Sequence, residues 1–304
     1  MTNARYILMN GEPVAHDQAR IHVTAPALAY ATAVFEGIRA YWDESSKQMY
    51  VFRLDDHLRR LQFSMRAMYY EERWEIEDLR HQVLNAIRVN ELRQDIHLRM
   101  LAMVEGDTAI TTSGPVTLAI TAGPYPANRW TDKGMAVGVS SWQRVHDTAS
   151  PPRIKATANY SNGRLAMLEA RRHGYDTALM LTREGKVAEA PVATCFIVRQ
   201  NQVFTPLPTD GILESITRDT LIQLFRHELN TGVTERSIDR TEIYDADEMF
   251  FCGSGWEVTP VASVDRIDLK QPAPGQHTKA VRDLYMRVVR SEVPERSEWL
   301  TPVW

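Results

Sequence analysis

Apolar and polar residues alternate with two different periods in the first 122 residues. YILMNGEPV, residues 6–14, is typical of two short strands joined by a turn at Asn10–Gly11, and MYVFRL of another strand. Between residues 57 and 68, apolar side chains recur at helical spacing, namely Leu58, Leu61, Met65 and Met68. A further helix is predicted for IEDLRHQVLNAIRVN, and two strands for HLRMLAMVE and VTLAITA. This mixture predicts a small α/β domain over residues 1–122.

The pattern breaks at GPYPANRWTDKG, residues 123–134, which holds two prolines, two glycines and aromatic residues that we expect to be exposed. We predict an interdomain loop over residues 123–135 and a second domain over residues 136–304. The strands predicted beyond the loop are MAVGVSSW, TALMLT, CFIVR, QVFTPL and EMFFCG, and the helices are NGRLAMLEARRHG and ITRDTLIQLFRHEL. This domain is richer in strand than the first, and its long connections indicate an irregular barrel.

Composition narrows the class of protein. Hydrophobic residues make up 44% and charged residues 24% of the 304 residues, close to the averages of folded globular proteins. The net charge is -4, and the lysines and arginines are scattered, so we expect no nucleic-acid partner. The first residues lack the pattern of a signal peptide, and no apolar run approaches the roughly 18 residues of a membrane span. We therefore expect a cytoplasmic protein with no membrane partner.

Several common kinds of site have no support in the sequence. The two cysteines, Cys195 and Cys252, lie in apolar runs without a CxxC pair, so we expect buried thiols rather than a disulfide or a metal site. The nine histidines are dispersed, and we predict no bound metal. The motifs GxxxxGK[ST], HExxH and GxSxG are missing, which counts against nucleotide hydrolysis and zinc chemistry.

Four other features suggest a cofactor when they are taken together. Lys155 precedes a predicted helix. The predicted hairpin TREGKVAEA carries Glu189 on a strand directly before the apolar run ATCFIV, where an unpaired carboxylate would be costly. Ser215 and Thr217 are cap residues at a predicted helix start, a natural anion site, and FCGSGWEVTPV leads a strand into a small-residue loop. Each feature alone has an ordinary structural explanation. Together they match pyridoxal 5′-phosphate, which needs a lysine, a carboxylate at its ring nitrogen and a phosphate cradle.

A set of motifs then suggests a family. They are ALAYATAVFEGIRAY, FRLDDHLRRL, IKATANY, EARRHGYD, KVAEA, ITRD, ADEMFFCG and EVTPVASVD, and they span nearly the whole chain. In this order and spacing the sequence resembles the class IV aminotransferases, most closely the branched-chain amino-acid aminotransferases. The resemblance implies fold type IV, with a small α/β N-terminal domain and a larger pseudo-barrel C-terminal domain. It also implies a homodimer or higher homo-oligomer.

The resemblance assigns roles to individual residues. Lys155 is the catalytic lysine that bonds covalently to pyridoxal 5′-phosphate. The other residues matched to cofactor binding are Tyr160 at the phenolic oxygen, Glu189 at the ring nitrogen, and Arg60, Ile216, Thr217 and Ser254 at the phosphate. Arg99 matches the arginine that takes the distal carboxylate of glutamate. The remaining substrate-binding positions are Tyr30, Phe35, His97, Gly255 and Trp256.

The sequence departs from the family mainly near the substrate. The glycine-rich run after the glutamate is here Ala190–Cys195, and Ser254–Gly255 stands where the family has Thr-Ala. Ala-Thr-Ala follows the lysine in place of Ala-Gly-Gly, Glu214–Ser215 replaces Pro-Gly, and His97 stands where the family has a tyrosine.

We expect transamination dependent on pyridoxal 5′-phosphate, with glutamate or 2-oxoglutarate as one partner. The other partner is a branched-chain amino acid or a specialised one, aromatic or unusual. Two alternatives stay open: a D-amino-acid transaminase or aminodeoxychorismate lyase of the same class, and a non-catalytic relative. Visible absorbance of bound cofactor would separate the last from the enzymes.

Overall fold

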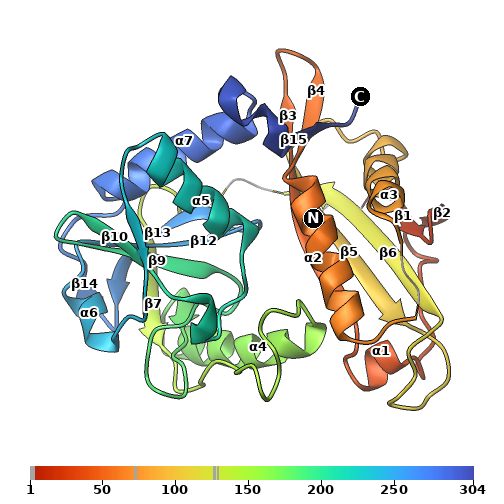
Figure 1. Ribbon diagram of the computed structural model, residues 1–304, viewed down its shortest axis with the longest axis horizontal. Coiled ribbons are helices and arrows are strands. Elements are labelled where there is room, and N and C mark those ends of the chain that lie inside the picture. The colour runs from red at the N-terminus through yellow and green to blue at the C-terminus, as the bar shows by residue number, and fades with distance from the viewer. Residues whose placement is uncertain (1–3, 72–73, 126–127, 129) are drawn as a thin grey trace. The chain divides into compact units, whose positions relative to one another are not determined.

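Two units make up the chain, and each takes residues from separate stretches of sequence. The computed structural model describes residues 4–71, 74–125, 128 and 130–304 (Figure 1). Unit 1 contains the described residues up to Tyr125, together with Ile154–Ala158 and Arg287–Trp304. Unit 2 contains the described residues from Asn128 to Arg153, together with Asn159–Met286.

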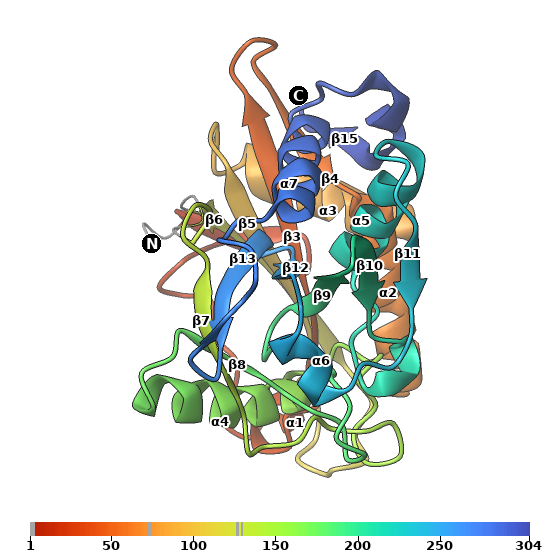
Figure 2. The ribbon, with the colours of Figure 1, turned by 90° about the vertical axis from the view of Figure 1, so that its left-hand side faces the viewer.

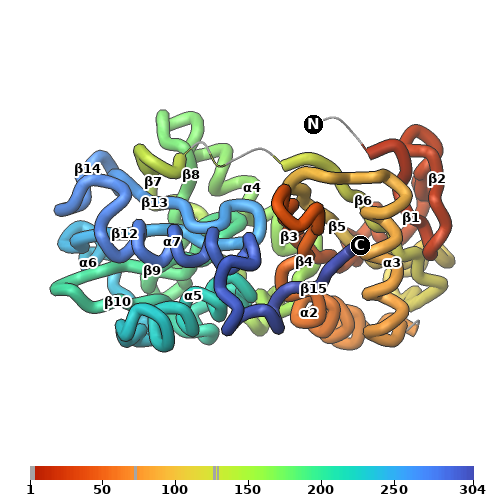
Figure 3. Tube along the Cα trace, turned by 90° about the horizontal axis from the view of Figure 1, so that it is seen from above, coloured from red at the N-terminus to blue at the C-terminus, as the bar shows by residue number. Residues whose placement is uncertain are grey.

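This division differs from the predicted boundaries, which kept residues 136–304 in one domain. Ile154–Ala158 belongs to unit 1 because Phe35 N donates to Lys155 O (3.0 Å) and Val34 forms a bridge with Ala156. The C-terminal residues belong to unit 1 because β15 (Leu300–Pro302) pairs with β4 (Gln48–Phe52), as Figure 3 shows in dark blue beside orange. Both links join residues far apart in sequence.

The predicted loop over residues 123–135 lies partly outside the described residues, at 126, 127 and 129. Within the described part, strand structure continues to Pro124, and the expected exposure of the aromatic residues was wrong. Tyr125 and Trp130 are both half-buried. Tyr125 packs against the His97 ring with centroids 5.4 Å apart and the ring planes tilted by 35°, and Trp130 packs against the apolar core of unit 2.

Unit 1 is built on one sheet covered by two helices. Its described strands lie in the order β15-β4-β3-β5-β6-β1-β2. Their bounds, beyond those given above, are β1 (Tyr6–Met9), β2 (Glu12–Ala15), β3 (Val34–Asp43), β5 (Ile96–Val104) and β6 (Val116–Pro124). The helical segments are α1 (Pro26–Ala29), α2 (Leu54–Ala67), α3 (Ile76–Arg88) and η2 (Pro294–Trp299). The predicted hairpin turn at Asn10–Gly11 is confirmed, with positive φ at both residues.

Alternation along the central strand β3 gives the sheet two different faces. Val34, Ile38 and Ala40 are fully buried in the core beneath α2 and α3, which lie side by side (Figure 1). Leu58, Leu61 and Met65 of α2 complete this core, and Met68 packs against it, as the helical spacing predicted. Phe35 and Gly37 lie on the other face, because side chains alternate along a strand.

Unit 2 combines a larger sheet with helices. Its strands lie in the order β11-β10-β9-β12-β13-β7-β8, with β14 beside β13. Their bounds are β7 (Met135–Val139), β8 (Thr177–Leu179), β9 (Thr194–Arg199), β10 (Gln202–Thr205), β11 (Val233–Glu235), β12 (Glu248–Gly253), β13 (Glu257–Val264) and β14 (Ile267–Asp268). The helical segments are η1 (Pro208–Asp210), α5 (Ile216–His227), α6 (Arg240–Tyr244) and the greater parts of α4 (Thr157–Arg172) and α7 (Gln276–Val289), whose first two and last three residues, respectively, belong to unit 1. Helix α5 packs against this sheet, whereas α4 runs beside β8 (Figure 2).

Three local predictions are corrected or confirmed in unit 2. Helix α4 begins at Thr157, so Asn159 and Tyr160 lie inside its first turn rather than ahead of the helix. The hairpin predicted to carry Glu189 on a strand is reduced to isolated bridges, including Leu181 with Val187, and Glu189 lies outside any strand. Both cysteines are buried and free, as predicted. Burial raises the pKa of both thiols.

Among the described helices, none has the length and apolar character needed to cross a membrane.

Candidate active site

Lys155 is held through its main chain by two elements of unit 1. Phe35 N of β3 donates to Lys155 O, and Lys155 N donates to Ser64 Oγ of α2 at 3.2 Å. The Thr157 hydroxyl donates to the carbonyl oxygens of Ala31 and Ala33, which ties the same segment to the start of β3. Hydrogen bonds to β3, to α2 and to the residues just before β3 therefore fix the backbone from which the lysine side chain extends.

A buried ionic cluster lies on the helix-covered face of the same strand. Glu36 is 0% exposed, and Arg60 of α2 donates to both of its oxygens, from Nε at 2.6 Å and from NH2 at 2.8 Å. His57 Nδ1 lies 2.6 Å from Glu36 Oε2. Burial alone would raise the pKa of Glu36, but the charge of Arg60 and the contact with His57 outweigh it and hold that pKa well below its usual range. Burial lowers the pKa of His57, so we infer a neutral ring that donates from Nδ1 to the carboxylate.

Cationic and aromatic side chains gather on the opposite face of the sheet. The β3–β5 register pairs Gly37 with Arg99 and Arg39 with His97. The Arg39 guanidinium lies 4.5 Å from the centroid of the Tyr125 ring. Gly37 leaves room for the His97 ring, because a Cβ at this position would lie 3.0 Å from His97 Nε2. Burial, followed by the charges of Arg99 and Arg39, lowers the pKa of His97 to about 4, which keeps the ring neutral at pH 7.

Phe35 is the residue at which this face meets the lysine. Lys155 Nζ lies 4.8 Å from the centroid of the Phe35 ring, and the Arg99 guanidinium carbon lies 5.7 Å from the same centroid. Both distances fall within the range of a cation–π contact. An amine and a guanidinium are therefore placed on one aromatic ring within unit 1.

In unit 2, Glu189 is held by an arginine that the sequence did not identify. The carboxylate is 4% exposed, and its Oε1 lies 2.7 Å from Arg144 NH2 and 3.2 Å from Leu213 N. Arg144 is 7% exposed and donates from Nε to Gly211 O at 3.1 Å. The partner that a buried Glu189 was expected to need is thus Arg144.

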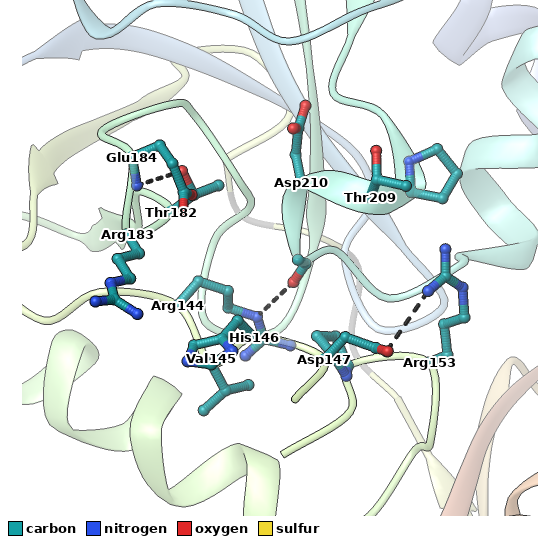
Figure 4. Close-up of a pocket in the computed structure, with 13 residues that line it drawn as sticks. Arg144, Val145, His146, Asp147, Arg153, Thr182, Arg183, Glu184, Thr209 and Asp210 are labelled. Atoms are coloured by element: carbon teal, nitrogen blue, oxygen red, sulfur yellow. Dashed lines mark hydrogen bonds and ion pairs between the residues drawn. The ribbon is translucent and has the colours of Figure 1, made fainter. Parts of the chain in front are cut away.

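Arg144 also lines a polar hollow of about 220 Å³ in unit 2 (Figure 4). Charged side chains from three loops surround it, among them Asp147, Arg153 and Asp210. Arg153 contacts Asp147 at 3.6 Å and donates to Glu214 at 2.7 Å, so much of the charge in this hollow is compensated locally. The predicted site residues are not among the described residues that line it.

Two further elements of unit 2 carry the predicted phosphate residues. Helix α5 begins at Ile216, and the N-cap Ser215 accepts a hydrogen bond from Arg218 N at 3.2 Å, as its cap character predicted. Thr217 is buried in the first turn, where the helix dipole favours an anion. Strands β12 and β13 pair up to Gly253 and Glu257, so Ser254–Trp256 form the turn between them. Trp256 packs edge-on against Phe251 at 5.8 Å.

Comparison with known proteins identifies the family. The family model of amino-transferase class IV matches residues 33–264. The chain belongs to the class IV aminotransferases. A probable branched-chain-amino-acid aminotransferase of Aquifex aeolicus is 35% identical over 301 residues, which cover 98% of this chain and 97% of that protein. The predicted branched-chain aminotransferase family is thereby confirmed as well.

Solved structures of this family share the whole fold. The branched-chain amino acid aminotransferase of Thermobaculum terrenum, in its PLP form, is 42% identical with a TM-score of 0.95, and the match covers 100% of both chains. The T.th. branched-chain amino acid aminotransferase complexed with N-(5′-phosphopyridoxyl)-L-glutamate is 32% identical with a TM-score of 0.94 over 99% of each chain. The predicted two-domain mixed α/β fold of type IV is confirmed by these likenesses.

The class IV aminotransferase distributes its predicted site residues over both units. Unit 1 carries Tyr30, Phe35, Arg60, His97, Arg99 and Lys155, whereas unit 2 carries Tyr160, Glu189, Ile216, Thr217, Ser254, Gly255 and Trp256. Contacts within unit 1 bring Lys155, Phe35 and Arg99 together. Tyr30, directly after α1, is exposed. The individual roles of these residues stay predictions.

Sequence reasoning missed Glu36, His57, Ser64 and Arg144. For Glu36 a signal was present, since a carboxylate in register with Val34 and Ile38 occupies a core position of the strand. In the altered run, Ala190–Ala193 form a turn in which Ala190 N donates to Ala193 O at 2.8 Å, and Thr194 and Cys195 begin β9. Helix α4 packs closely on it, because a Cβ at Gly163 would lie 2.7 Å from Pro191 O.

Proposed function

We propose that this protein transfers the amino group between glutamate and a branched-chain amino acid, with pyridoxal 5′-phosphate as its cofactor. The observation that carries the proposal is the shared ring of Phe35, with Lys155 Nζ at 4.8 Å and the Arg99 guanidinium at 5.7 Å from its centroid. A guanidinium can bind a substrate carboxylate through paired hydrogen bonds. The neighbouring amine can then act at the carbon that bears the amino group.

The residues present fit the cofactor in their chemistry. Glu189 is a buried carboxylate next to Arg144, which suits a group that must stay charged to pair with a protonated ring nitrogen. Arg60 and the first turn of α5, with Ile216 and Thr217, would hold the phosphate, and Ser254 would join them. Tyr160 would donate to the phenolic oxygen. When bound, pyridoxal 5′-phosphate supplies a ring that accepts electrons from the substrate.

Lys155 performs two tasks in this proposal. Its Nζ would hold the resting cofactor covalently. Once the substrate amine has displaced it, the free Nζ would take the proton from the substrate Cα and give it up to the cofactor carbon from which the amine was displaced. Its main chain, fixed by Phe35 and Ser64, limits how far the amine can move between these positions.

Arg99 and His97 would set the choice of substrate. Arg99 is exposed on its strand and can reach a distal carboxylate, while the neutral His97 offers a donor and an acceptor without adding charge. Phe35 and Tyr30 would contact an apolar side chain, and Gly255 and Trp256 would complete the substrate site. The glutamate derivative bound to the T.th. relative supports glutamate as one partner.

A homodimer is part of the proposal. The segment before β3 exposes three large apolar side chains, Val23 at 73%, Leu28 at 58% and Tyr30 at 46%, which a second copy would cover. Light scattering of the purified protein should give twice the chain mass. A monomer would leave these side chains in solvent and contradict this part of the proposal. The predicted cytoplasmic location stays a prediction.

The experiment that tests the function is spectroscopic. Purified protein is saturated with pyridoxal 5′-phosphate, and single amino acids are added while the visible absorbance is followed. We expect rapid loss of the visible band with leucine, isoleucine, valine and glutamate. A response to glutamate alone would mean that the protein is a transaminase whose second substrate is a specialised amino acid and not a branched-chain one. A protein that binds no cofactor would contradict the whole proposal.

A further inference from the structure

Two consecutive residues of β3 hold two different parts of the proposed cofactor site. Phe35 N donates to Lys155 O at 3.0 Å, so β3 fixes the segment that carries the lysine. The next residue, Glu36, points to the opposite face and binds the Arg60 guanidinium through both of its oxygens. The strand β3 therefore contacts both the main chain of Lys155 and the guanidinium of Arg60, the arginine that we assign to the phosphate.

Helix α2 repeats this arrangement from the other side. Arg60 and Ser64 lie four residues apart, on the same face of the helix. Arg60 binds Glu36, and Ser64 Oγ accepts the hydrogen bond of Lys155 N. His57, one turn before Arg60, contacts the second oxygen of Glu36 at 2.6 Å. The carboxylate is therefore contacted from two consecutive turns of the helix.

Core stability does not explain why a carboxylate stands in this place. Glu36 is 0% exposed, and its neighbours on the same face of the strand are apolar. Desolvation makes a buried ion pair no more stabilising, in general, than apolar residues of similar size. A bidentate pair does, however, fix the plane and the position of a guanidinium. This geometric effect is what the cluster adds to unit 1.

We propose that Glu36 is the positioning residue of the phosphate site and that His57 supports it. Glu36 holds the Arg60 guanidinium in one orientation, ready for the phosphate, at a fixed distance along α2 from the residue that holds Lys155. The neutral His57 orients the carboxylate without adding charge to the cluster. This inference rests on the proposed function, in which Arg60 binds the cofactor phosphate.

The test compares two cofactors that differ only in the phosphate. Dissociation constants of pyridoxal 5′-phosphate and of pyridoxal are measured by visible absorbance for the parent protein and for Glu36→Gln. We expect Glu36→Gln to weaken binding of the phosphorylated form by about tenfold or more, since a charge-assisted contact is lost. Binding of pyridoxal should change less than about twofold. Loss of both affinities to the same degree, or of neither, would overturn the proposal.

Matched variants separate this inference from the function on which it rests. Glu77→Gln, which breaks an exposed pair with Arg80 in the same unit, should change neither constant. Arg60→Gln should lower only the affinity for the phosphorylated form, and Glu36→Gln should add nothing in that background. If Arg60→Gln leaves the ratio of the two dissociation constants unchanged, Arg60 does not bind the phosphate and its assignment fails. If Arg60→Gln shows the loss and Glu36→Gln does not, only the positioning role fails.

A second variant covers the case in which Glu36→Gln does not fold. His57→Gln removes one contact to the carboxylate and keeps the Arg60 pair. We expect it to weaken binding of the phosphorylated cofactor by roughly threefold and to leave pyridoxal unchanged. An unchanged ratio of the two constants in a folded His57→Gln protein would contradict the supporting role of the histidine. If Glu36→Gln cannot be produced, that unchanged ratio would overturn the proposal.

Discussion

Each unit contains one deeply buried carboxylate paired with an arginine, and the two pairs are built differently. In unit 1, Glu36 takes two hydrogen bonds from Arg60 and one contact from His57, which together engage both of its oxygens. Glu36 lies on the strand β3, and both of its partners lie on the helix α2. In unit 2, the contacts of Glu189 with Arg144 and Leu213 both fall on Oε1, and the residue lies outside any strand.

The difference separates two uses of a buried charge. A carboxylate whose two oxygens are engaged by a strand-and-helix cluster is suited to fixing a neighbour, which is the role we propose for Glu36. A carboxylate at the end of an irregular segment is suited to meeting a ligand, as we propose for Glu189. The predictions below test this contrast between fixing a neighbour and binding the cofactor.

The largest effect should come from Glu189→Gln. Without a negative charge at the ring nitrogen, the cofactor loses the group that keeps its ring protonated, and the turnover number should fall by a hundredfold or more, roughly as for removal of one stabilising group in other sites. Steady-state kinetics with glutamate measures this loss. Glu36→Gln, assayed with saturating cofactor, should lose much less activity. Equal losses in the two variants would remove the proposed contrast.

Removing Arg144 should act mainly on the stability of the protein. Arg144→Met takes this cation away from the buried Glu189, which we expect to lower the free energy of unfolding by about 3–5 kcal/mol. Denaturant titration of the cofactor-free protein measures the change. Arg183→Met, at an exposed position on the same hollow, should stay within about 0.5 kcal/mol of the parent. A small effect of Arg144→Met would mean that water replaces the guanidinium beside Glu189.

Acid should destabilise unit 1 through the protonation of His97. The Glu189–Arg144 pair of unit 2 includes no histidine. Burial and the charges of Arg99 and Arg39 lower the pKa of His97 from 6.5 to about 4. Between these values the unfolded chain binds a proton that the folded chain does not, so stability falls as the pH falls from 6.5 to 4. His97→Gln should remove about 2 kcal/mol of this loss between pH 7 and pH 5. Unfolding free energies at pH 7 and pH 5 check this, and parallel pH profiles of parent and variant would exclude His97 as the source.

The sequence predicted the elements better than it predicted their long-range connections. Helix α2 and the pair β5–β6 follow strong local periods, and the structure confirms them. The transfer of Ile154–Ala158 to unit 1 depends on bonds to Ala33 and Phe35, more than a hundred residues earlier, and no local pattern encodes such pairing. Tyr125 was expected in solvent because prolines surround it, yet its ring packs on His97.

The residues of the candidate site likewise fall into those that local sequence patterns indicate and those that only the tertiary structure brings together. Lys155, Glu189 and the start of α5 could be selected from local residue patterns, because a lysine, a carboxylate and a helix cap each have a recognisable setting. Arg144 could not, since only folding brings it to within 2.7 Å of Glu189. Ser64 carries no signal beyond a polar residue on the apolar face of a helix. Such partners follow from tertiary packing and need the three-dimensional structure.

Of these four variants, Ser64→Ala should have the smallest effect, and this effect should also be the most selective. The variant removes the acceptor of Lys155 N while keeping α2, because alanine favours a helix. Loss of this hydrogen bond should cost about 1 kcal/mol of stability and lower the turnover number several-fold. Ser45→Ala, at an exposed position of the same unit, should change neither.

Since Ser64 contacts the lysine segment and Glu36 contacts Arg60, Ser64→Ala should leave the ratio of the affinities for pyridoxal 5′-phosphate and pyridoxal unchanged. A change in this ratio as large as that expected for Glu36→Gln would mean that α2 moves as a rigid body. Ser64 and Glu36 could then not act separately on the lysine segment and on Arg60.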